Sequence, residues 1–303
     1  MSSLTPMMQQ YMEIKEQYKD CILFFRLGDF YEMFFEDAIA ASRELEITLT
    51  GRDCGLEERA PMCGVPFHSV EPYISKLVNK GYKVAICEQV EDPALAKGIV
   101  KREVIRVVTP GTVIESSMLD ERKNNYILSI YNNKCFFGLA FADVSTGEFH
   151  TTQVIWGNTK NKLIDEIGKY SPAEIIVNTS LYDNNSIMRI IRNKFSAYIY
   201  HFDDEYFEYG NAAKMVESCF NDAALLKSGK DLSICASGAL LAYIKQTQKV
   251  DFAHIRDIHL YDMEEYMVLD ISSRKHLELT ETMRDMKRKG SLLWVLDRTI
   301  TAM

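Results

Sequence analysis

Apolar and polar positions along residues 1–112 alternate in blocks whose period changes between two and about 3.6. Short apolar runs flanked by charges predict buried strands, and amphipathic stretches predict the helices that cover them. We expect, in chain order, a helix at 7–18, a strand at 21–27, a helix at 30–42, a helix at 70–82 closed by Gly81, a strand at 83–90 and a strand at 102–112 that ends in a Pro-Gly turn. This order is typical of an α/β domain.

A second α/β pattern begins near residue 124. Residues 125–155 alternate in a way that predicts three strands in a meander, with turns at Asn132-Asn133 and Ser145-Thr146-Gly147. The segments that follow are a helix at 159–170, a strand at 173–177, a helix at 183–194, a strand at 197–201, and helical stretches at 211–226 and 231–248. Together they predict a mixed sheet with helices on its faces.

The character of the chain changes again near residue 262. The remaining residues predict a largely helical segment, with Ser272 or Ser273 as its N-cap and an apolar cluster at 292–296. This segment is too short to bury that cluster alone, so we expect it to pack back on the rest or to belong to a longer protein. The pattern as a whole predicts a domain at 1–110, a linker at 111–123, a domain at 124–250 and a helical segment at 251–303.

Composition narrows the class of protein. The 303 residues are 47% hydrophobic and 26% charged, which is ordinary for a globular protein, and no apolar run reaches membrane-spanning length. The beginning of the chain lacks a basic region followed by an apolar stretch, so nothing predicts export. Seven cysteines, an odd number with no CxxC pair, favour reduced core thiols in a cytoplasmic protein over a disulfide framework or a zinc site.

The net charge of −8 does not by itself predict a nucleic-acid-binding protein, because such proteins usually carry a basic footprint. Any contact with phosphates would depend on local patches. One such patch combines four basic side chains with a single acid among them: Lys97, Lys101, Arg102 and Arg106, with Glu103. A solvated edge accounts for these charges equally well, so charge alone leaves a DNA-backbone role and a structural role open.

The motifs of common catalytic and cofactor chemistry are absent from the sequence. It contains no phosphate-binding GxxxxGK[ST], no dinucleotide-binding GxGxxG, no HExxH and no GxSxG. The six histidines fall at no metal-ligand spacing. We therefore expect no cofactor, no metal and no catalytic residue in these 303 residues.

The stretch GDFYEMFFEDA, residues 28–38, combines four aromatic side chains with four carboxylates. A structural explanation is a helix that starts at Phe30, with Asp29 as its N-cap and Glu32 reaching back to the N–H of the cap, as in a capping box. The apolar side chains of the inner face would then belong to the core: Met33, Phe34 and Ala38. A capped helix accounts for every residue type in the stretch.

A functional explanation uses the outer pair, Phe30 and Glu32. A projecting aromatic ring acts as a wedge that unstacks a base step and kinks the duplex. Unstacking costs a few kcal/mol and costs least where the pair is already mismatched, so a wedge selects for deformability rather than for base identity. A carboxylate beside the wedge makes sense if it hydrogen-bonds a base. To donate to a purine N7 it must be protonated, which a dry and anionic setting favours.

Several strings together resemble the N-terminal part of the bacterial MutS family of DNA mismatch-repair proteins. They are FFRLGDFYEMFFEDA at 24–38, LEITLTGR at 45–52, PMCGVPFHSVEPYISKLVNKGYKVAICEQVEDP at 61–93, VIRVVTPGT at 104–112 and FFGLAFADVSTGEF at 136–149. The resemblance continues through residues 269–303 and so covers the whole chain. It implies an α/β protein with an N-terminal mixed α/β mismatch-recognition domain, an RNase H-like α/β connector domain and the start of a mainly helical core.

The resemblance also implies roles for individual residues. Phe30 corresponds to the phenylalanine of the family's Phe-X-Glu motif, which stacks on the mispaired base, and Glu32 corresponds to the glutamate that hydrogen-bonds that base. Arg52, Met62 and Gly64 lie in segments, expected to be loops, that match those the family lays along the minor groove and the DNA backbone.

Ligand and partners follow from the resemblance as expectations. The expected ligand is double-stranded DNA with mispaired or looped bases, and the expected partners are a second copy of the protein, a MutL-type repair protein and a sliding clamp. The family's C-terminal ATPase, which uses ATP and magnesium, has no counterpart in this sequence, so we expect no enzyme activity and interpret the chain as the front part of a longer protein. We expect it in the bacterial cytoplasm, associated with the nucleoid.

An RNase H-like connector raises one alternative, a metal-dependent nuclease. Such enzymes need several carboxylates that converge on two metal ions. The candidates are Asp143 at a strand end, Glu148 after the Ser-Thr-Gly turn, and Asp203 and Asp204 in a loop. The turn accounts for the first two without a metal, and a fold does not imply a function, so DNA recognition is the favoured interpretation.

Overall fold

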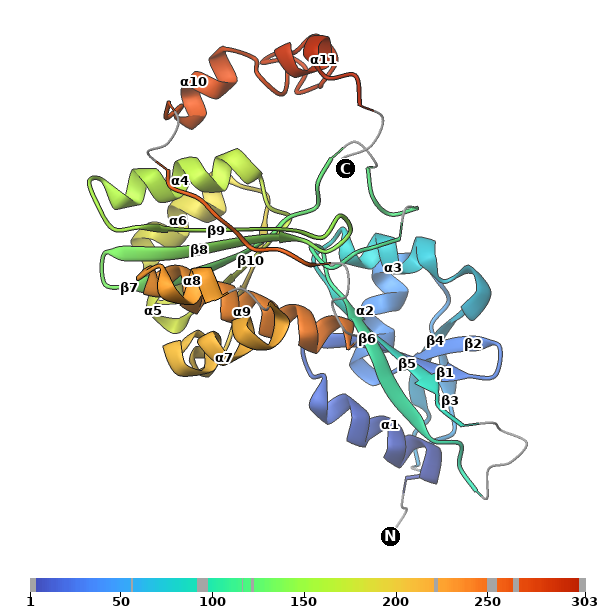
Figure 1. Ribbon diagram of the computed structural model, residues 1–303. Helices are drawn as coiled ribbons and strands as arrows, with labels where there is room; N and C mark the ends of the chain where they lie inside the picture. The colour runs from blue at the N-terminus through green and yellow to red at the C-terminus, as the bar shows by residue number, and fades with distance from the viewer. Residues whose placement is uncertain are drawn as a thin grey trace. The chain divides into compact units, whose positions relative to one another are not determined.

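The computed structural model describes residues 4–55, 57–91, 98–115, 117–120, 123–220, 223–249, 255–263 and 267–299 (Figure 1). The chain forms two compact units. The first unit consists of residues 1–118 with a short piece at the end of helix α9 (Asp231–Gln248), and the second of residues 119–245 and 251–303. Each unit is built on a six-stranded sheet of its own.

The first unit has helices on both faces of a mixed sheet. Its elements are α1 (Pro6–Gln17), β1 (Cys21–Leu27), β2 (Phe30–Phe34), α2 (Phe35–Leu45), β3 (Thr50–Arg52), β4 (Ala60–Pro66), the 3-10 turn η1 (Phe67–Ser69), α3 (Glu71–Val78), β5 (Lys83–Gln89) and β6 (Arg102–Val108). The strand order is β3-β4-β2-β1-β5-β6. Strands β1 and β5 run parallel, and the other neighbouring pairs are antiparallel.

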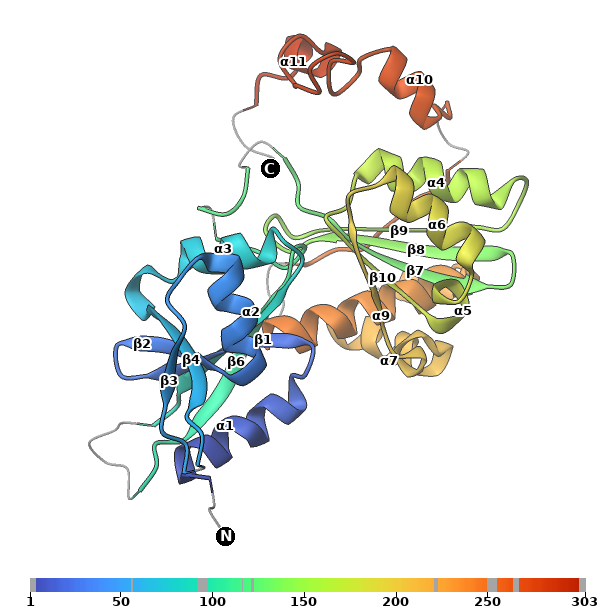
Figure 2. The same ribbon diagram turned by 180° about the vertical axis from the view of Figure 1, so that it is seen from behind.

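Helix α1 packs against one face of this sheet, and α2 and α3 cover the other face (Figures 1 and 2). The ring of Tyr11 on α1 lies edge-on to Phe25 and Phe34, with centroids 5.4 and 5.0 Å away. On α2 and α3 the inward residues recur at helical spacing and are buried: Ala38, Ala41, Leu45, Ile74, Leu77 and Val78. Both layers therefore follow from the amphipathic pattern of the sequence.

Of the elements expected in this unit, all but one are confirmed, with ends that shift by a few residues. The helix expected from Phe30 is wrong, because residues 30–34 form β2 and α2 begins only at Phe35. Asp29 is therefore not an N-cap, and Glu32 takes no part in a capping box. Strand β2 hydrogen-bonds to β1 on one side and to β4 on the other, and this pairing outweighs the local helix signals.

The core positions expected in the same stretch are confirmed, since the side chains of Met33, Phe34 and Ala38 are fully buried. Strands β3 and β4 are not predicted by the pattern. Strand β3 has only three residues, and β4 contains Gly64 and two prolines, which obscure the alternation of a strand.

The second unit places a mixed sheet between two layers of helices. Its elements are β7 (Ile127–Asn133), β8 (Phe136–Asp143), β9 (Glu148–Val154), α4 (Thr159–Tyr170), β10 (Glu174–Val177), α5 (Thr179–Tyr182), α6 (Asn185–Lys194), β11 (Tyr198–His201), η2 (Asp204–Phe207), α7 (Tyr209–Cys219), α8 (Ala223–Lys227), most of α9, β12 (His259–Leu260), α10 (Ile271–His276) and α11 (Leu292–Leu296). The strand order is β11-β10-β7-β8-β9-β12. Helices α4 and α6 pack on one face, and α7 and α9 on the other (Figure 2).

The meander and the mixed sheet expected in this unit are confirmed. The first hairpin turn lies at Lys134-Cys135 rather than at Asn132-Asn133, because β7 and β8 stay paired as far as Asn133 and Phe136. Helix α9 approaches β8 so closely that a Cβ built on Gly138 would lie 1.8 Å from the backbone oxygen of Leu232. Glycine is therefore required at that position of the sheet.

The largely helical tail expected after residue 262 is wrong for residues 267–299, which contain only the short helices α10 and α11. The N-cap of α10 is Asp270, which accepts a hydrogen bond from the Ser273 N–H, and neither expected serine caps it. The side chains of both helices are not buried, and helices this short need tertiary packing to extend. Across the described ranges, no helix combines the length and apolar character needed to cross a bilayer.

A buried acid, Asp37, connects three elements of the first unit. Its carboxylate accepts hydrogen bonds from the Leu23 N–H at 3.0 Å and from the Tyr11 hydroxyl at 3.2 Å, and it pairs with the Lys15 ammonium at 2.8 Å. Burial, and then the charge of Asp37, raise the pKa of Tyr11, which keeps its hydroxyl a donor. The interaction joins α1, β1 and α2.

We expect Asp37→Ala to lower the free energy of unfolding of the first unit by about 3 kcal/mol, because it leaves buried donors and an ammonium group without their acceptor. Urea unfolding followed by circular dichroism measures the change. Glu36→Ala is the matched control, since Glu36 is an exposed acid in the same helical turn. Equal losses in the two variants would contradict a structural role for Asp37.

The cysteines are free thiols, and five of them are buried: Cys21, Cys54, Cys63, Cys87 and Cys235. Burial raises the pKa of Cys21, Cys63 and Cys87 to about 12. At pH 8 a thiol with such a pKa is ionised to the extent of only about 1 part in 10⁴. Cys135 is exposed, and Cys219 is partly exposed.

We expect a thiol reagent at pH 8 to react rapidly with one cysteine, Cys135, more slowly with Cys219, and with the buried cysteines only after unfolding. The thiolate is the reactive form, so a raised pKa and burial both slow the reaction. Cys135→Ser should remove the rapid phase of absorbance change. A rapid phase that survives this substitution would contradict the described burial.

Candidate nucleic-acid interface

Phe30 and Glu32 stand two residues apart on β2 and therefore project from the same face of the sheet. Phe30 is the first residue of the strand, and it is 47% exposed. It follows the two-residue turn Gly28-Asp29, and its cross-strand neighbours are Leu27 and Pro66. Gly28 has a φ of +57°, a value that favours glycine. The turn thus presents an aromatic ring to solvent at the end of a hairpin.

The hairpin turn is fastened by contacts on both sides. The Arg26 guanidinium donates from Nε to the Gly28 carbonyl at 2.5 Å, and its carbon lies 3.4 Å from the centre of the Phe67 ring. The Phe67 N–H donates to the Asp29 carbonyl at 3.0 Å, which ties the turn to the end of β4. These contacts limit the movement of the residue that carries the exposed ring.

A second set of contacts lies under the hairpin. Glu88 on β5 accepts a hydrogen bond from the Tyr31 hydroxyl, and the Arg26 guanidinium lies 3.5 Å from the same carboxylate. Burial, and then the hydrogen bond to Glu88, raise the pKa of Tyr31, so its hydroxyl stays a donor. Sequence reasoning missed Arg26, Phe67 and Glu88 as part of the site. Arg26 is the one charged residue of the otherwise apolar strand β1, next to its last residue, and this is the signal that could have found Arg26.

Glu32 forms an ion pair with Arg52 on β3, two strands away in the sheet. Arg52, Met62 and Gly64 lie on β3 and β4 and not in the expected loops, which corrects that expectation. Gly64 is the cross-strand partner of Glu32, and a Cβ built on it would lie 3.4 Å from Cγ of Glu32. Met62 pairs with Phe34 on the same face. The sheet therefore brings these three residues next to Glu32.

The four basic residues suggested by charge do not form one patch. Lys97 lies outside the described residues. Lys101 is exposed and pairs with Glu103 at 2.6 Å. Arg102 is buried: it lies over the Phe25 ring and donates to backbone oxygens of Arg26 and Val100 and to the side chain of Gln10. Of the three that the structure describes, Lys101 is the one with an exposed side chain.

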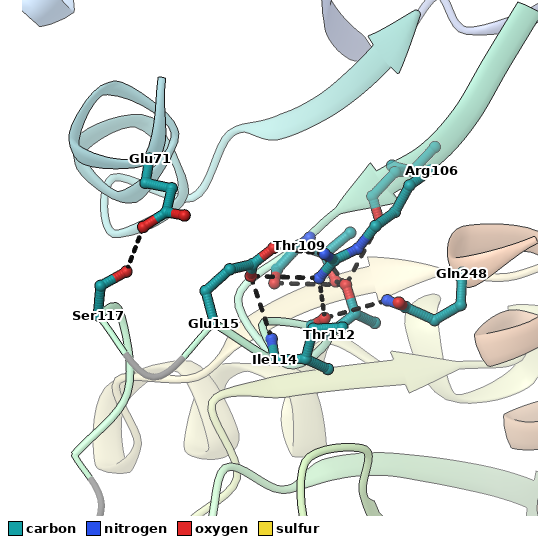
Figure 3. A network of polar contacts seen from close by, with 9 residues as sticks. Glu71, Arg106, Thr109, Thr112, Ile114, Glu115, Ser117 and Gln248 are labelled. Carbon is teal, nitrogen blue, oxygen red and sulfur yellow. Dashed lines mark hydrogen bonds and ion pairs between the residues drawn. The ribbon is translucent and has the colours of Figure 1, made fainter. Parts of the chain in front are cut away.

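Arg106 belongs to a polar network that closes the turn after β6 (Figure 3). Its guanidinium pairs with Glu115 at 2.5 Å and donates to the Thr112 carbonyl at 3.0 Å. The Gln248 amide donates to the same carbonyl at 3.0 Å, and the hydroxyl groups of Thr109 and Thr112 lie 2.9 Å apart. Arg102 and Arg106 therefore have structural partners, and their role as DNA-backbone contacts remains a prediction without support from exposure.

Three of the four carboxylates of the nuclease alternative, Asp143, Glu148 and Asp204, hold local structure in the second unit. Asp143 is fully buried and accepts hydrogen bonds from the N–H and hydroxyl of Ser145 and from the Asn125 N–H. Glu148 accepts from the Tyr126 hydroxyl at 2.5 Å, and Asp204 from the Thr179 N–H at 2.8 Å. Within the part of the chain that the structure describes, no cluster of three or more His, Cys, Asp or Glu side chains is placed to hold a metal ion. The nuclease alternative therefore has no support.

Known proteins match the chain along its whole length. Two family models match it: MutS domain I over residues 5–117 and MutS domain II over residues 125–256. The DNA mismatch repair proteins MutS of Acetivibrio thermocellus and Ruminiclostridium cellulolyticum are each 63% identical to it over 303 residues, and that of Alkaliphilus oremlandii is 54% identical over 308 residues. Each match covers 100% of this chain and 35% of the relative, so the chain spans about a third of the length of these relatives.

These matches agree with the two units of the structure, each of which is a mixed α/β domain with helices on both faces of its sheet. The two models together cover most of the residues, and relatives with more than half of their aligned residues identical extend along the entire chain. The chain therefore belongs to the MutS family of DNA mismatch repair proteins, of which it carries domains I and II.

Proposed function

We propose that the first unit recognises mispaired or looped bases in double-stranded DNA, with the Phe30 ring stacked against the base and the Glu32 side chain hydrogen-bonded to it. The observation that carries this proposal is the half-exposed Phe30 ring at the end of a fastened hairpin, with Glu32 on the same face. The names of the relatives, DNA mismatch repair proteins, support the same ligand.

The physics of a wedge fits these features. An exposed ring held on a rigid turn loses little conformational freedom when it stacks on a base, so most of the stacking free energy remains available for binding. Inserting it must still unstack a base step, which costs least where pairing is already defective. The hairpin contacts of Arg26 and Phe67 supply the rigidity that this mode of recognition requires.

We propose that Arg52, Met62, Gly64 and Lys101 contact the groove or backbone of the DNA beside the wedge, and that Lys97 does so as well. Arg102 and Arg106 stabilise the fold through the contacts described above, and a DNA-backbone role for them stays a prediction. So few cations, in a chain with a net charge of −8, predict weak binding by this chain that declines only modestly with salt.

The wider role is proposed from the relatives, about three times as long as this chain. We propose that the protein acts in mismatch repair in the bacterial cytoplasm at the nucleoid, as a dimer that works with a MutL-type repair protein and a sliding clamp. The second unit, whose acids serve local structure, would then contact other proteins rather than cut DNA.

We expect Phe30→Ala to lower the ratio of affinities for a duplex with one G·T mismatch and for its matched control by about tenfold, since base stacking on an aromatic ring contributes about 1–3 kcal/mol. Fluorescence anisotropy at low and moderate salt measures both affinities. Phe136→Ala is the matched control, because Phe136 is a phenylalanine on β8 of the second unit with a similar exposure of 41%.

The proposal fails if Phe30→Ala keeps the wild-type ratio. It also fails for this chain if the wild type binds neither duplex at low salt. A loss of the ratio in Phe136→Ala as well would point to a general effect of removing an exposed ring.

We expect Arg26→Ala to lower the same ratio about threefold, because the turn that carries Phe30 loses its contacts with Phe67 and Gly28. Arg26→Lys retains the positive charge but not the flat guanidinium and should fall between the wild type and Arg26→Ala. Hydrogen exchange of the 27–31 amides checks that the turn has loosened. If Arg26→Ala has faster exchange but keeps the wild-type ratio of affinities, the rigidity of the turn does not contribute to recognition and the prediction is wrong.

A further inference from the structure

The residue beside Phe30 that would meet the base is an acid, and this acid is not alone. The Glu32 carboxylate pairs with the Arg52 guanidinium across β4. The side chain of Glu32 is 17% exposed and that of Arg52 is 38% exposed, so the pair lies at the surface with the acid as its more covered member. Such a pair holds Glu32 in one orientation and cancels most of its charge.

DNA repels an unpaired carboxylate electrostatically. Duplex DNA carries one negative charge for about every 1.7 Å of its axis, so an anion brought against the bases is repelled by phosphates on both strands. A cation fixed to that anion removes the repulsion and leaves the oxygens able to accept a hydrogen bond. In this structure the Arg52 guanidinium is the cation that neutralises the Glu32 carboxylate.

We propose that Arg52 is a positioning residue for base recognition: it acts through Glu32, by neutralising and orienting the carboxylate that approaches the base beside the Phe30 ring. The inference rests on the proposed function of Phe30 and Glu32. This role differs from a simple contact with a phosphate, because the effect of Arg52 on base recognition depends on its ion pair with Glu32.

A glycine on β4, Gly64, lies beside the acid of this pair. Gly64 on β4 is the cross-strand partner of Glu32, and Ala60 on the same strand is the cross-strand partner of Arg52. A Cβ on Gly64 would lie 3.3 Å from the Tyr31 carbonyl oxygen, which is tight, and 3.4 Å from Cγ of Glu32, so a side chain there would lie directly against the acid. The absence of a side chain at Gly64 leaves the space beside the Glu32 side chain open.

The test is a double-mutant cycle on the 303-residue chain, with the mismatched and matched duplexes as ligands. We expect Arg52→Gln to lower the ratio of the two affinities about fivefold, and Arg52→Lys, which retains a cation, to lower it less. In a Glu32→Gln background, Arg52→Gln should change the ratio less than about twofold, because no charge remains to be neutralised. Thermal unfolding of each variant checks that the fold is intact.

Arg43→Gln is the matched control. Arg43 is an exposed arginine of the same unit that pairs with Glu44 at 3.0 Å, so the substitution removes the same charge from a comparable pair on α2. We expect Arg43→Gln to keep the wild-type ratio. If it lowers the ratio as much as Arg52→Gln does, net charge is the cause and the proposal is overturned.

Three further outcomes overturn the role of Arg52. In the first, Arg52→Gln weakens binding to both duplexes equally, as a simple phosphate contact would. In the second, the loss of the ratio persists in the Glu32→Gln background, so that Arg52 acts without Glu32. In the third, Arg52→Gln raises the ratio, which would mean that Arg52 competes with the base for Glu32. A failure of the proposed function is distinct, because then Phe30→Ala keeps the wild-type ratio or the wild type binds neither duplex.

Discussion

The candidate interface depends on the pairing of β2 with β1 on one side and β4 on the other. This pairing gives residues 30–34 the two-residue period of a strand, so Phe30 and Glu32 leave from one face while Tyr31 and Met33 are buried. It also places the turn before Phe30 against the end of β4, where Arg26 and Phe67 hold it. If residues 30–34 formed a helix, the wedge and the acid would point about 200° apart around its axis and could not meet one base pair.

In the first unit, many charged side chains form local ion pairs and do not gather into a large patch of one sign. Glu32 faces Arg52, Asp37 faces Lys15, and Arg106 faces Glu115. These 303 residues have a net charge of −8, so under the proposed function they would recognise a mismatch through close contacts rather than through long-range attraction to DNA. An aromatic ring and a neutralised carboxylate suit this situation, because neither relies on attraction at a distance.

In the second unit, the acids considered for a nuclease have local structural partners. Asp143 and Glu148 flank the turn between β8 and β9, and their oxygens are occupied by N–H and hydroxyl donors of their own hairpin and of residues 124–126. Asp143 is buried and Glu148 is partly exposed, and with such partners both acids hold the turn in place. The close approach of α9 to β8 at Gly138 likewise reflects packing of the two layers.

The sequence by itself determined the α/β class, the helices around each sheet and most strands, because apolar periodicity records which face of an element is buried. It also pointed to Phe30, Glu32 and, through resemblance, to Arg52, Met62 and Gly64. Only the tertiary structure decided that residues 30–34 are a strand, that Arg102 and Arg106 are occupied within the fold, and that Arg52 reaches Glu32. Strand pairing and ion pairs join residues far apart in the chain, and no local pattern records which partner a residue will meet.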